Sequence, residues 1–237
     1  MLRAVERPER GSARIEGFSD AVFGFAITLL VVSLEVPKSF AELSETMEGF
    51  VAFALCFTLM IWIWVEHYRF FRAFGLADGA TILLNSTLLF VVLFYVYPLK
   101  FLFTALVKIL TGLGPPLPAG AMTDGRVLLR SYSLGFTVVF LVLAALYLHA
   151  WRRREALPLD ALGRFDARAG IVRHAATAGV GLFSIALTYV LPDRQLAWAG
   201  WLFGALGPIH GLLGFRQGRA RERLTRELAA RERDAAE

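Results

Sequence analysis

Residues 14–37 read RIEGFSDAVFGFAITLLVVSLEVP, and this stretch decides what kind of fold the chain adopts. It carries no charge from Ala21 to Ser33, and with its flanks it reaches the roughly 20 residues of helix that cross a bilayer. Asp20 stands about one turn inside the start of the apolar run, where an unpaired carboxylate costs about 2.5 kcal/mol or more. The stretch therefore predicts a transmembrane helix whose acid needs a polar partner.

Helical spacing of about 100° per residue separates three faces of this segment. One face is an apolar stripe made of Phe18, Val22, Phe25, Leu29, Val32 and Val36. Beside it runs a stripe of small residues that lets another backbone approach closely, made of Gly17, Ala21, Gly24 and Thr28. Asp20 and Phe23 lie on roughly the opposite side from Phe25. If the Phe25 face points into a pore, Asp20 points away from it, which favours a bracing role over ion ligation.

Two other interpretations fit parts of this stretch. The first is a cleaved signal peptide, with basic residues before it and a weak cleavage site at Ser39-Phe40-Ala41. The apolar run is longer than a usual signal sequence and has an acid near its start, which weighs against this interpretation. The second is an ordinary membrane helix whose acid is merely capped, and the pattern alone leaves it open.

The composition of the whole chain agrees with a membrane protein. Hydrophobic residues make up 57% of the chain, against about 45–50% in soluble domains. The single cysteine, Cys56, lies in an apolar run, which excludes an intramolecular disulfide and a cysteine-based zinc site. The net charge is +5, but the arginines cluster at the ends of apolar runs, as membrane topology requires. We therefore expect no nucleic-acid partner.

Apolar runs recur along the sequence and predict an all-α, polytopic membrane protein with roughly six transmembrane helices per subunit. Their expected bounds are 15–36, 47–68, 79–103, 127–151, 170–191 and 195–215. Together they would form one transmembrane channel domain, 1–215, followed by a charged tail, 216–237, where Arg and Glu interleave as on a solvated helix. Pro98 should break or kink the third helix.

Positive charge alternates between the two sides of the predicted bundle. One side holds the arginines before the first span, Arg69 and Arg72, the arginine-rich stretch 152–173, and the tail. The other side holds mainly Lys38, Lys100, Lys108, Arg126 and Arg194. Because positively charged loops stay inside the cell, both the N- and C-termini are expected to be cytoplasmic in a multi-pass protein of the cell membrane.

The chain carries no recognisable catalytic pattern. It contains no Gly-rich phosphate loop, no H-E-x-x-H zinc motif and no G-x-S-x-G nucleophile turn. The four histidines are His67, His149, His174 and His210. They fall near span ends without partners at metal-ligand spacing, which favours structural roles for them. We therefore predict a protein that is not an enzyme and needs no cofactor or metal.

The first span carries a more specific signal. Arg14, Phe18, Ser19 and Asp20 fit the pattern R-x-x-x-F-S-D, and an Ala-Val-Phe…Ala-Ile-Thr-Leu-Leu run follows. This segment closely resembles the bacterial branch of the transmembrane protein 175 family, the lysosomal potassium channels. The segment WVEHYRFF at 64–71 resembles the end of that family's second helix. Asp78, Asn85 and Pro98 fall where its third helix has similar residues, so the resemblance covers about 14–103.

The resemblance implies a potassium-permeable homotetramer of six-span subunits, with the first helix of each lining a central pore. The family's apolar constriction matches Phe25, Leu29 and Val32, which would act as a hydrophobic gate by excluding water. Phe25 stands where relatives usually have isoleucine. The hydroxyls of Thr28 and Ser33 could face the pore or bond to their own helix. The implied partners are further copies of the chain, membrane lipid and potassium ions.

The resemblance also implies a signature polar network that holds the pore helix in register. Its candidate members are Arg14, Phe18, Ser19, Asp20, Trp64, His67 and Asn85. An alternative function is a proton-coupled secondary transporter that uses Asp20 as its proton site, which would show coupled uptake and usually paired repeats with broken helices. A membrane scaffold or enzyme is a second alternative, but catalytic residues are missing and we find no convincing internal repeat.

Overall fold

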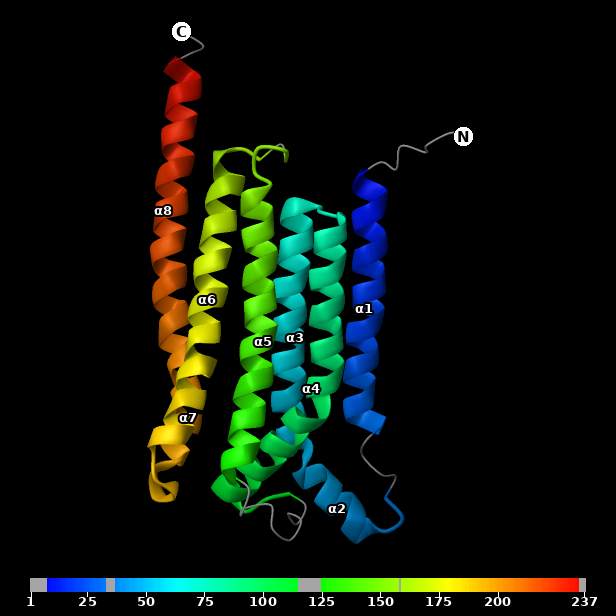
Figure 1. The fold of residues 1–237 in the computed structure, drawn as a ribbon. Coiled ribbons are helices and arrows are strands. Elements are labelled where there is room, and N and C mark those ends of the chain that lie inside the picture. The colour runs from blue at the N-terminus through cyan, green and yellow to red at the C-terminus, as the bar shows by residue number, and fades with distance from the viewer. Residues whose placement is uncertain (1–7, 33–36, 115–124, 158, 235–237) are drawn as a thin grey trace.

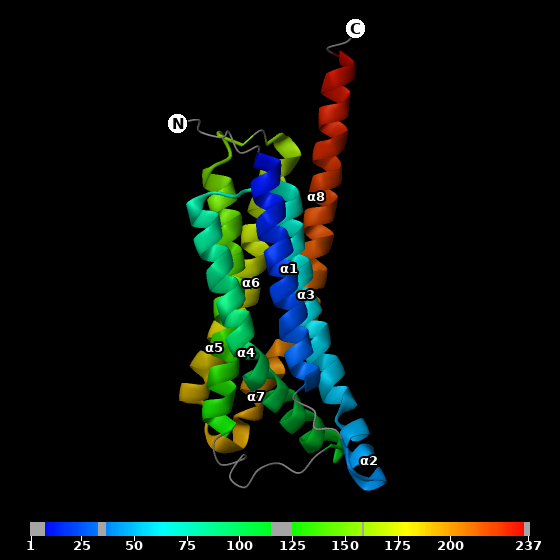
Figure 2. The ribbon, with the colours of Figure 1, turned by 90° about the vertical axis from the view of Figure 1, so that its right-hand side faces the viewer.

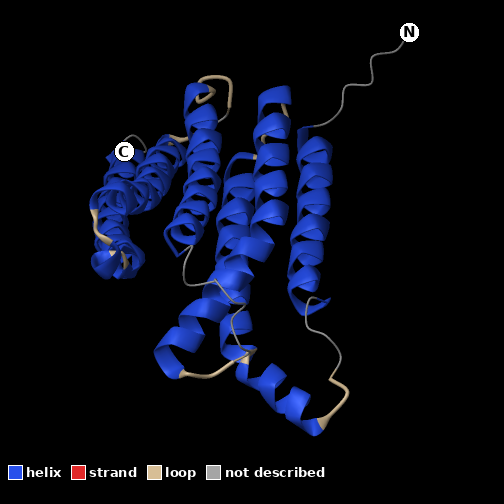
Figure 3. Ribbon diagram, turned by 60° about the horizontal axis from the view of Figure 1, so that its bottom comes forward, coloured by secondary structure: helices blue, strands red, loops and turns tan. Residues whose placement is uncertain are grey.

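The computed structural model describes residues 8–32, 37–114, 125–157 and 159–234, and Figure 3 shows that these residues form helices joined by short loops. The bundle is built, in chain order, from α1 (Pro8–Val32), α2 (Phe40–Glu48), α3 (Phe50–Phe74), α4 (Gly79–Thr111), α5 (Gly125–Arg152) and α6 (Ala161–Val190). The last part of the chain contains η1 (Asp193–Gln195), α7 (Ala197–Trp201), η2 (Leu202–Ala205) and α8 (Leu206–Asp234).

Six helical stretches in the described part of the chain are long and apolar enough to cross a membrane. They are Gly11–Val32, Phe50–Phe74, Gly79–Thr111, Gly125–Arg152, Ala161–Val190 and Asp193–Arg231. The predicted all-α fold with six apolar spans is therefore confirmed. The start of α1 and the end of α8 lie at the same end of the bundle (Figure 1), as an even number of crossings requires.

Several helix bounds differ from those predicted from hydropathy. The second span begins at Phe50, because the helix is interrupted at Gly49 and the preceding residues form the separate helix α2. It extends to Phe74. The third helix continues to Thr111. Gly75 and Gly112 end α3 and α4 with φ angles of 55° and 73°, left-handed conformations that glycine adopts without strain.

The third and sixth spans depart from single straight helices. Pro98 lies inside α4, and Figure 2 shows that α4 changes direction along its length. A proline removes a backbone donor and its ring clashes with the preceding turn, which bends a helix. The predicted sixth span, 195–215, is divided into η1, α7, η2 and the start of α8. The described part of the predicted charged tail, 216–234, continues directly from this span, because α8 runs without a break to Asp234.

The core lies between the middle helices, and α1 occupies one edge of the bundle, against α3 and α4 (Figure 1). The α5–α6 pair approaches most closely where glycines face larger side chains. A Cβ on Gly170 would overlap the ring of Tyr147, and one on Gly181 would overlap Thr137 Oγ1. Small residues thus bring the two helices together, as is common in membrane proteins.

Candidate functional site

The inner face of α1 is packed against its own subunit. Phe23, Ala26 and Leu30 are buried, with Phe23 only 2% exposed. The ring of Phe23 lies 5.6 Å from that of His67 on α3, measured between ring centroids. The side opposite Phe25 is therefore the side that faces the bundle, as the helical spacing predicts.

The outer face of α1 is apolar and uncovered in a single chain. Phe18, Phe25 and Val32 are 64%, 58% and 70% exposed. Leu29, between them, is half-buried and packs partly against the core. Ser33 lies outside the described residues. The small-residue stripe is open as well, because nothing lies within 4 Å of a Cβ built on Gly17 or Gly24.

Three buried polar side chains connect α1, α3 and α4. Asn85 of α4 donates its Nδ2 hydrogen to Ser19 Oγ at 2.9 Å. Its Oδ1 lies 2.8 Å from His67 Nε2, so this histidine nitrogen carries the donated hydrogen. Ser19 donates in turn to the carbonyl of Ile15 at 2.8 Å. Ser19, Asn85 and His67 Nε2 thus pair with one another where a lone polar group would be unfavourable, whereas His67 Nδ1 is buried without a partner among the described residues.

A second polar contact joins α1 to α3. The indole Nε1 of Trp64 donates to Asp20 Oδ1 at 2.8 Å, which gives the acid at the start of the apolar run its partner. Trp64 also stacks on Tyr68, with ring centroids 5.8 Å apart. Five of the seven predicted network residues are thus brought together in two neighbouring contacts.

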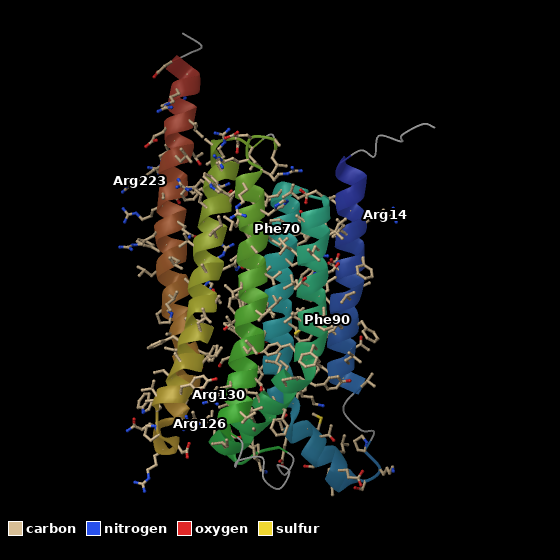
Figure 4. All side chains as sticks on the ribbon, in the orientation of Figure 1. Arg14, Phe70, Phe90, Arg126, Arg130 and Arg223 are labelled. Carbon is tan, nitrogen blue, oxygen red and sulfur yellow. The ribbon has the colours of Figure 1, made fainter. Side chains whose placement is uncertain are left out.

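The other predicted residues lie elsewhere. Arg14 and Phe18 are exposed, and Figure 4 shows Arg14 on the outer side of α1. Within the described part of the chain, no hydrogen bond or ion pair connects Arg14 to the contacts above. Thr28 donates to the carbonyl of Gly24 at 2.9 Å, the own-helix bond that was one of its two predicted options.

The sequence interpretation missed a buried ionic cluster centred on Glu66. The Glu66 side chain is 3% exposed and contacts Arg69 at 2.6 Å, Arg173 at 3.1 Å and His174 at 3.4 Å. The sequence did contain a signal for this cluster, because Glu66 lies inside a predicted apolar span, where an acid needs a partner. His149, which was predicted to be structural, has its Nε2 2.8 Å from Asp78 Oδ2.

A family model described as the endosomal/lysosomal potassium channel TMEM175 matches residues 14–95, the segment that holds α1 and both polar contacts. A potassium channel of Marivirga tractuosa is 38% identical over 211 residues, which cover 85% of each chain. The chain belongs to the TMEM175 potassium channel family.

Other TMEM175 relatives extend this similarity to the last three spans. A potassium channel of Chamaesiphon minutus is 28% identical over 198 residues, covering 80% of this chain and 89% of the relative. A crystallised variant of the potassium channel MtTMEM175, in complex with a nanobody–MBP fusion protein, superposes with a TM-score of 0.77 at 35% identity, over 92% of this chain and 97% of that one. This TMEM175 member is thus a multi-pass membrane protein from a family of channels, not of enzymes.

A second solved structure shares the fold alone. A lysosomal potassium-selective TMEM175 homologue from Chamaesiphon minutus has a TM-score of 0.59 at 24% identity, covering 87% of this chain and 97% of that one. The family-model match and the Marivirga tractuosa relative confirm the TMEM175 resemblance drawn from the first three spans.

Proposed function

We propose that this protein is a potassium-permeable cation channel, a homotetramer whose pore is lined by α1 of each subunit. The two-sided character of α1 carries the proposal. Its inner face is joined to α4 by the buried Ser19–Asn85 bond and to α3 by the Asp20–Trp64 bond, whereas its outer face exposes Phe25 and Val32. Relatives named as potassium channels support potassium as the permeant ion.

In the proposed tetramer, further copies of the chain pack against the exposed outer face of α1. The exposed surface continues on α4, where Phe90 and Phe94 are 70% and 73% exposed, and Figure 4 places Phe90 near α1. An apolar surface of this kind can face lipid or protein, but Gly17 and Gly24 leave space for the close backbone approach typical of helix–helix contacts. Closed rotational symmetry would bring the copies of α1 around one axis.

The proposed gate consists of Phe25, Leu29 and Val32, on successive turns of α1. At a rise of 1.5 Å per residue they span roughly 10 Å along the axis. A ring of apolar side chains narrower than a hydrated ion excludes water and blocks conduction. Potassium loses its water more easily than sodium because it is the larger ion, so a ring too narrow for a fully hydrated ion would favour potassium. The Phe25 ring could also offer its π face to the cation, worth about 0.5–2 kcal/mol.

The polar contacts would brace the gate rather than bind ions. Ser19, Asn85 and His67 fix one side of α1, and the Asp20–Trp64 bond fixes the neighbouring side. Because the Asp20 carboxylate accepts from an indole on α3, it lies away from the Phe25 face. This geometry favours the channel over a transporter that loads protons on Asp20, and the channel needs no cofactor.

We extend the proposal to membrane orientation. The end of the bundle where α1 begins and α8 ends carries most of the arginines and would face the cytoplasm. Residues 1–215 would form the channel domain, and the charged tail, 216–237, would project from the membrane as the continuation of α8.

Ion flux in liposomes tests the proposal. Purified protein is reconstituted, and potassium and sodium fluxes are compared for the parent, Phe25→Ala and Leu29→Ala, with Phe183→Ala as matched control. Phe183 is an equally exposed phenylalanine on α6, remote from α1. We expect uncoupled potassium flux that increases, with weaker selectivity, in the two α1 variants and is unchanged in the control.

Two results would overturn the proposal. Equal effects of Phe25→Ala and Phe183→Ala would show that α1 does not line the pore. Uptake that requires a proton gradient, and disappears in Asp20→Asn, would instead support the transporter.

A further inference from the structure

A cavity of about 360 Å³ lies between α3, α5, α6 and α8, on the other side of the bundle from α1. Its charged lining consists of Arg69, Arg173 and Arg221, with Asp166 as the only acid among the described lining residues. The arginines come from α3, α6 and α8, and Tyr147 of α5 and Gln217 of α8 add polar groups to the wall. Three guanidinium groups thus converge from three helices.

Two of these arginines are held in place by the buried acid behind them. Glu66 accepts from Arg69 NH1 at 2.6 Å and lies 3.1 Å from Arg173 NH2. A carboxylate buried this deeply is stable only when it is paired, so the two guanidinium groups are fixed before any ligand arrives. Arg221 crosses the opening to Asp166 with contacts of 3.0–3.3 Å.

The cluster keeps unused positive charge and hydrogen-bond donors. Three arginines face two acids, Glu66 and Asp166, which leaves a net charge of +1. The Arg69 and Arg221 side chains are 56% and 50% exposed, so both remain accessible to a ligand. Each guanidinium carries several donors in a planar fork that matches the oxygens of a phosphate group.

We propose that this cavity binds an anionic phosphate group. The arginine-rich end of the bundle is where phospholipid headgroups meet a membrane protein, and basic pockets between helices at this level recognise them. The ligand would also connect α8 to the bundle. No described residue of α8 is fully buried, so this helix gains little from apolar packing alone. A phosphate shared by Arg69, Arg173 and Arg221 would hold α8 against α3 and α6.

Thermal unfolding of the full-length protein in neutral detergent distinguishes the sources of the phosphate. The probes are phosphatidylglycerol, phosphatidylcholine, and inorganic phosphate compared with chloride at equal ionic strength. We expect phosphatidylglycerol to raise Tm and phosphatidylcholine not to. If inorganic phosphate raises Tm by a similar amount, a free anion is sufficient. If only phosphatidylglycerol raises Tm, the ligand is a lipid headgroup. The readout does not depend on ion conduction, so it can fail or succeed independently of the channel proposal.

Two charge-neutralising variants of α8 test the site. Arg221→Gln removes a cavity guanidinium that is half-exposed, and it leaves the Glu66 pairs intact. Arg223→Gln removes the same charge from the same helix at an exposed position outside the cavity (Figure 4). We expect Arg221→Gln to weaken the apparent affinity of the active probe about tenfold, and Arg223→Gln to bind as the parent does. Equal behaviour of the two variants, or no Tm increase of the parent with either anionic probe, would overturn the proposal.

Discussion

The indole of Trp64 donates a hydrogen bond to the carboxylate of Asp20 at 2.8 Å, and this bond joins α3 to α1 across 44 positions of sequence. An acid near the start of a membrane span needs a partner, and here the partner is an uncharged donor. The bond lies close to the buried Ser19–Asn85–His67 contacts, so α1 is attached along one side only. The opposite side remains free to face other subunits.

Removing the Asp20 carboxylate should weaken attachment of α1 more than it changes ion preference. We expect Asp20→Ala to lower stability by about 0.5–2 kcal/mol and to reduce the yield of assembled protein in size-exclusion chromatography. Trp64→Phe should reproduce the effect, because it removes the indole donor and keeps an aromatic ring beside Tyr68, and Trp201→Phe, at an exposed tryptophan of α7, should not. A normally assembled Asp20→Ala protein with altered potassium-to-sodium flux would refute the bracing role.

Asn85 should be the most sensitive position of the buried contacts, because it serves both Ser19 and His67. Asn85→Leu keeps the branched shape of the side chain but leaves His67 Nε2 unpaired and removes the donor to Ser19, which costs about 1–3 kcal/mol. Thermal unfolding in detergent measures the loss. Ser86→Ala, at the next and exposed position of α4, is the control and should unfold as the parent does. A similar Tm for the two variants would contradict the prediction.

The α5–α6 contact should not tolerate a methyl group at Gly170. A Cβ there would overlap the ring of Tyr147, whereas nothing lies within 4 Å of a Cβ on Gly179 of the same helix. Overpacking of this kind typically costs about 1–3 kcal/mol. We therefore expect Gly170→Ala to lower Tm and expression, and Gly179→Ala to leave both unchanged or slightly improved. Equal Tm values would show that the two helices do not approach as closely as described.

The connection between α3 and α4 should make stability dependent on acidic pH. Burial acts to raise the pKa of Asp78, but hydrogen bonds from Thr81 and His149 outweigh it and lower the pKa from 3.8 to about 2. Because the unfolded chain then binds more protons, this contribution is complete above about pH 4 and is lost as pH falls toward 2.

The experiment compares the Tm values of the parent and Asp78→Asn from about pH 5 down to about pH 2. The variant should be less stable near pH 5 and should lose less Tm on acidification. Asp160→Asn, at the N-cap of α6, provides a second capping position for comparison. An identical pH dependence in Asp78→Asn and the parent would exclude this carboxylate as the source.

Periodicity and hydropathy were sufficient to predict the membrane spans and the two faces of α1. Phe23 and Phe25 are two residues apart and so fall on opposite sides of a helix, whatever the helix packs against. The same reasoning did not predict that α2 and α3 are separate helices, because hydropathy placed Gly49 inside the predicted span 47–68. It also missed the importance of Glu66: Arg69 lies three residues away in sequence, but the partners Arg173 and His174 lie on another helix.

Residue type and helical repeat are enough to predict that the chain crosses a membrane several times and that its first helix has an apolar side and a bracing side. Both properties are local. Three-dimensional packing is needed to bring Asn85 to Ser19, to bring Trp64 to Asp20, and to place Arg69, Arg173 and Arg221 around one cavity. Such pairings depend on which helices are neighbours and at what height, and packing of the whole bundle sets both.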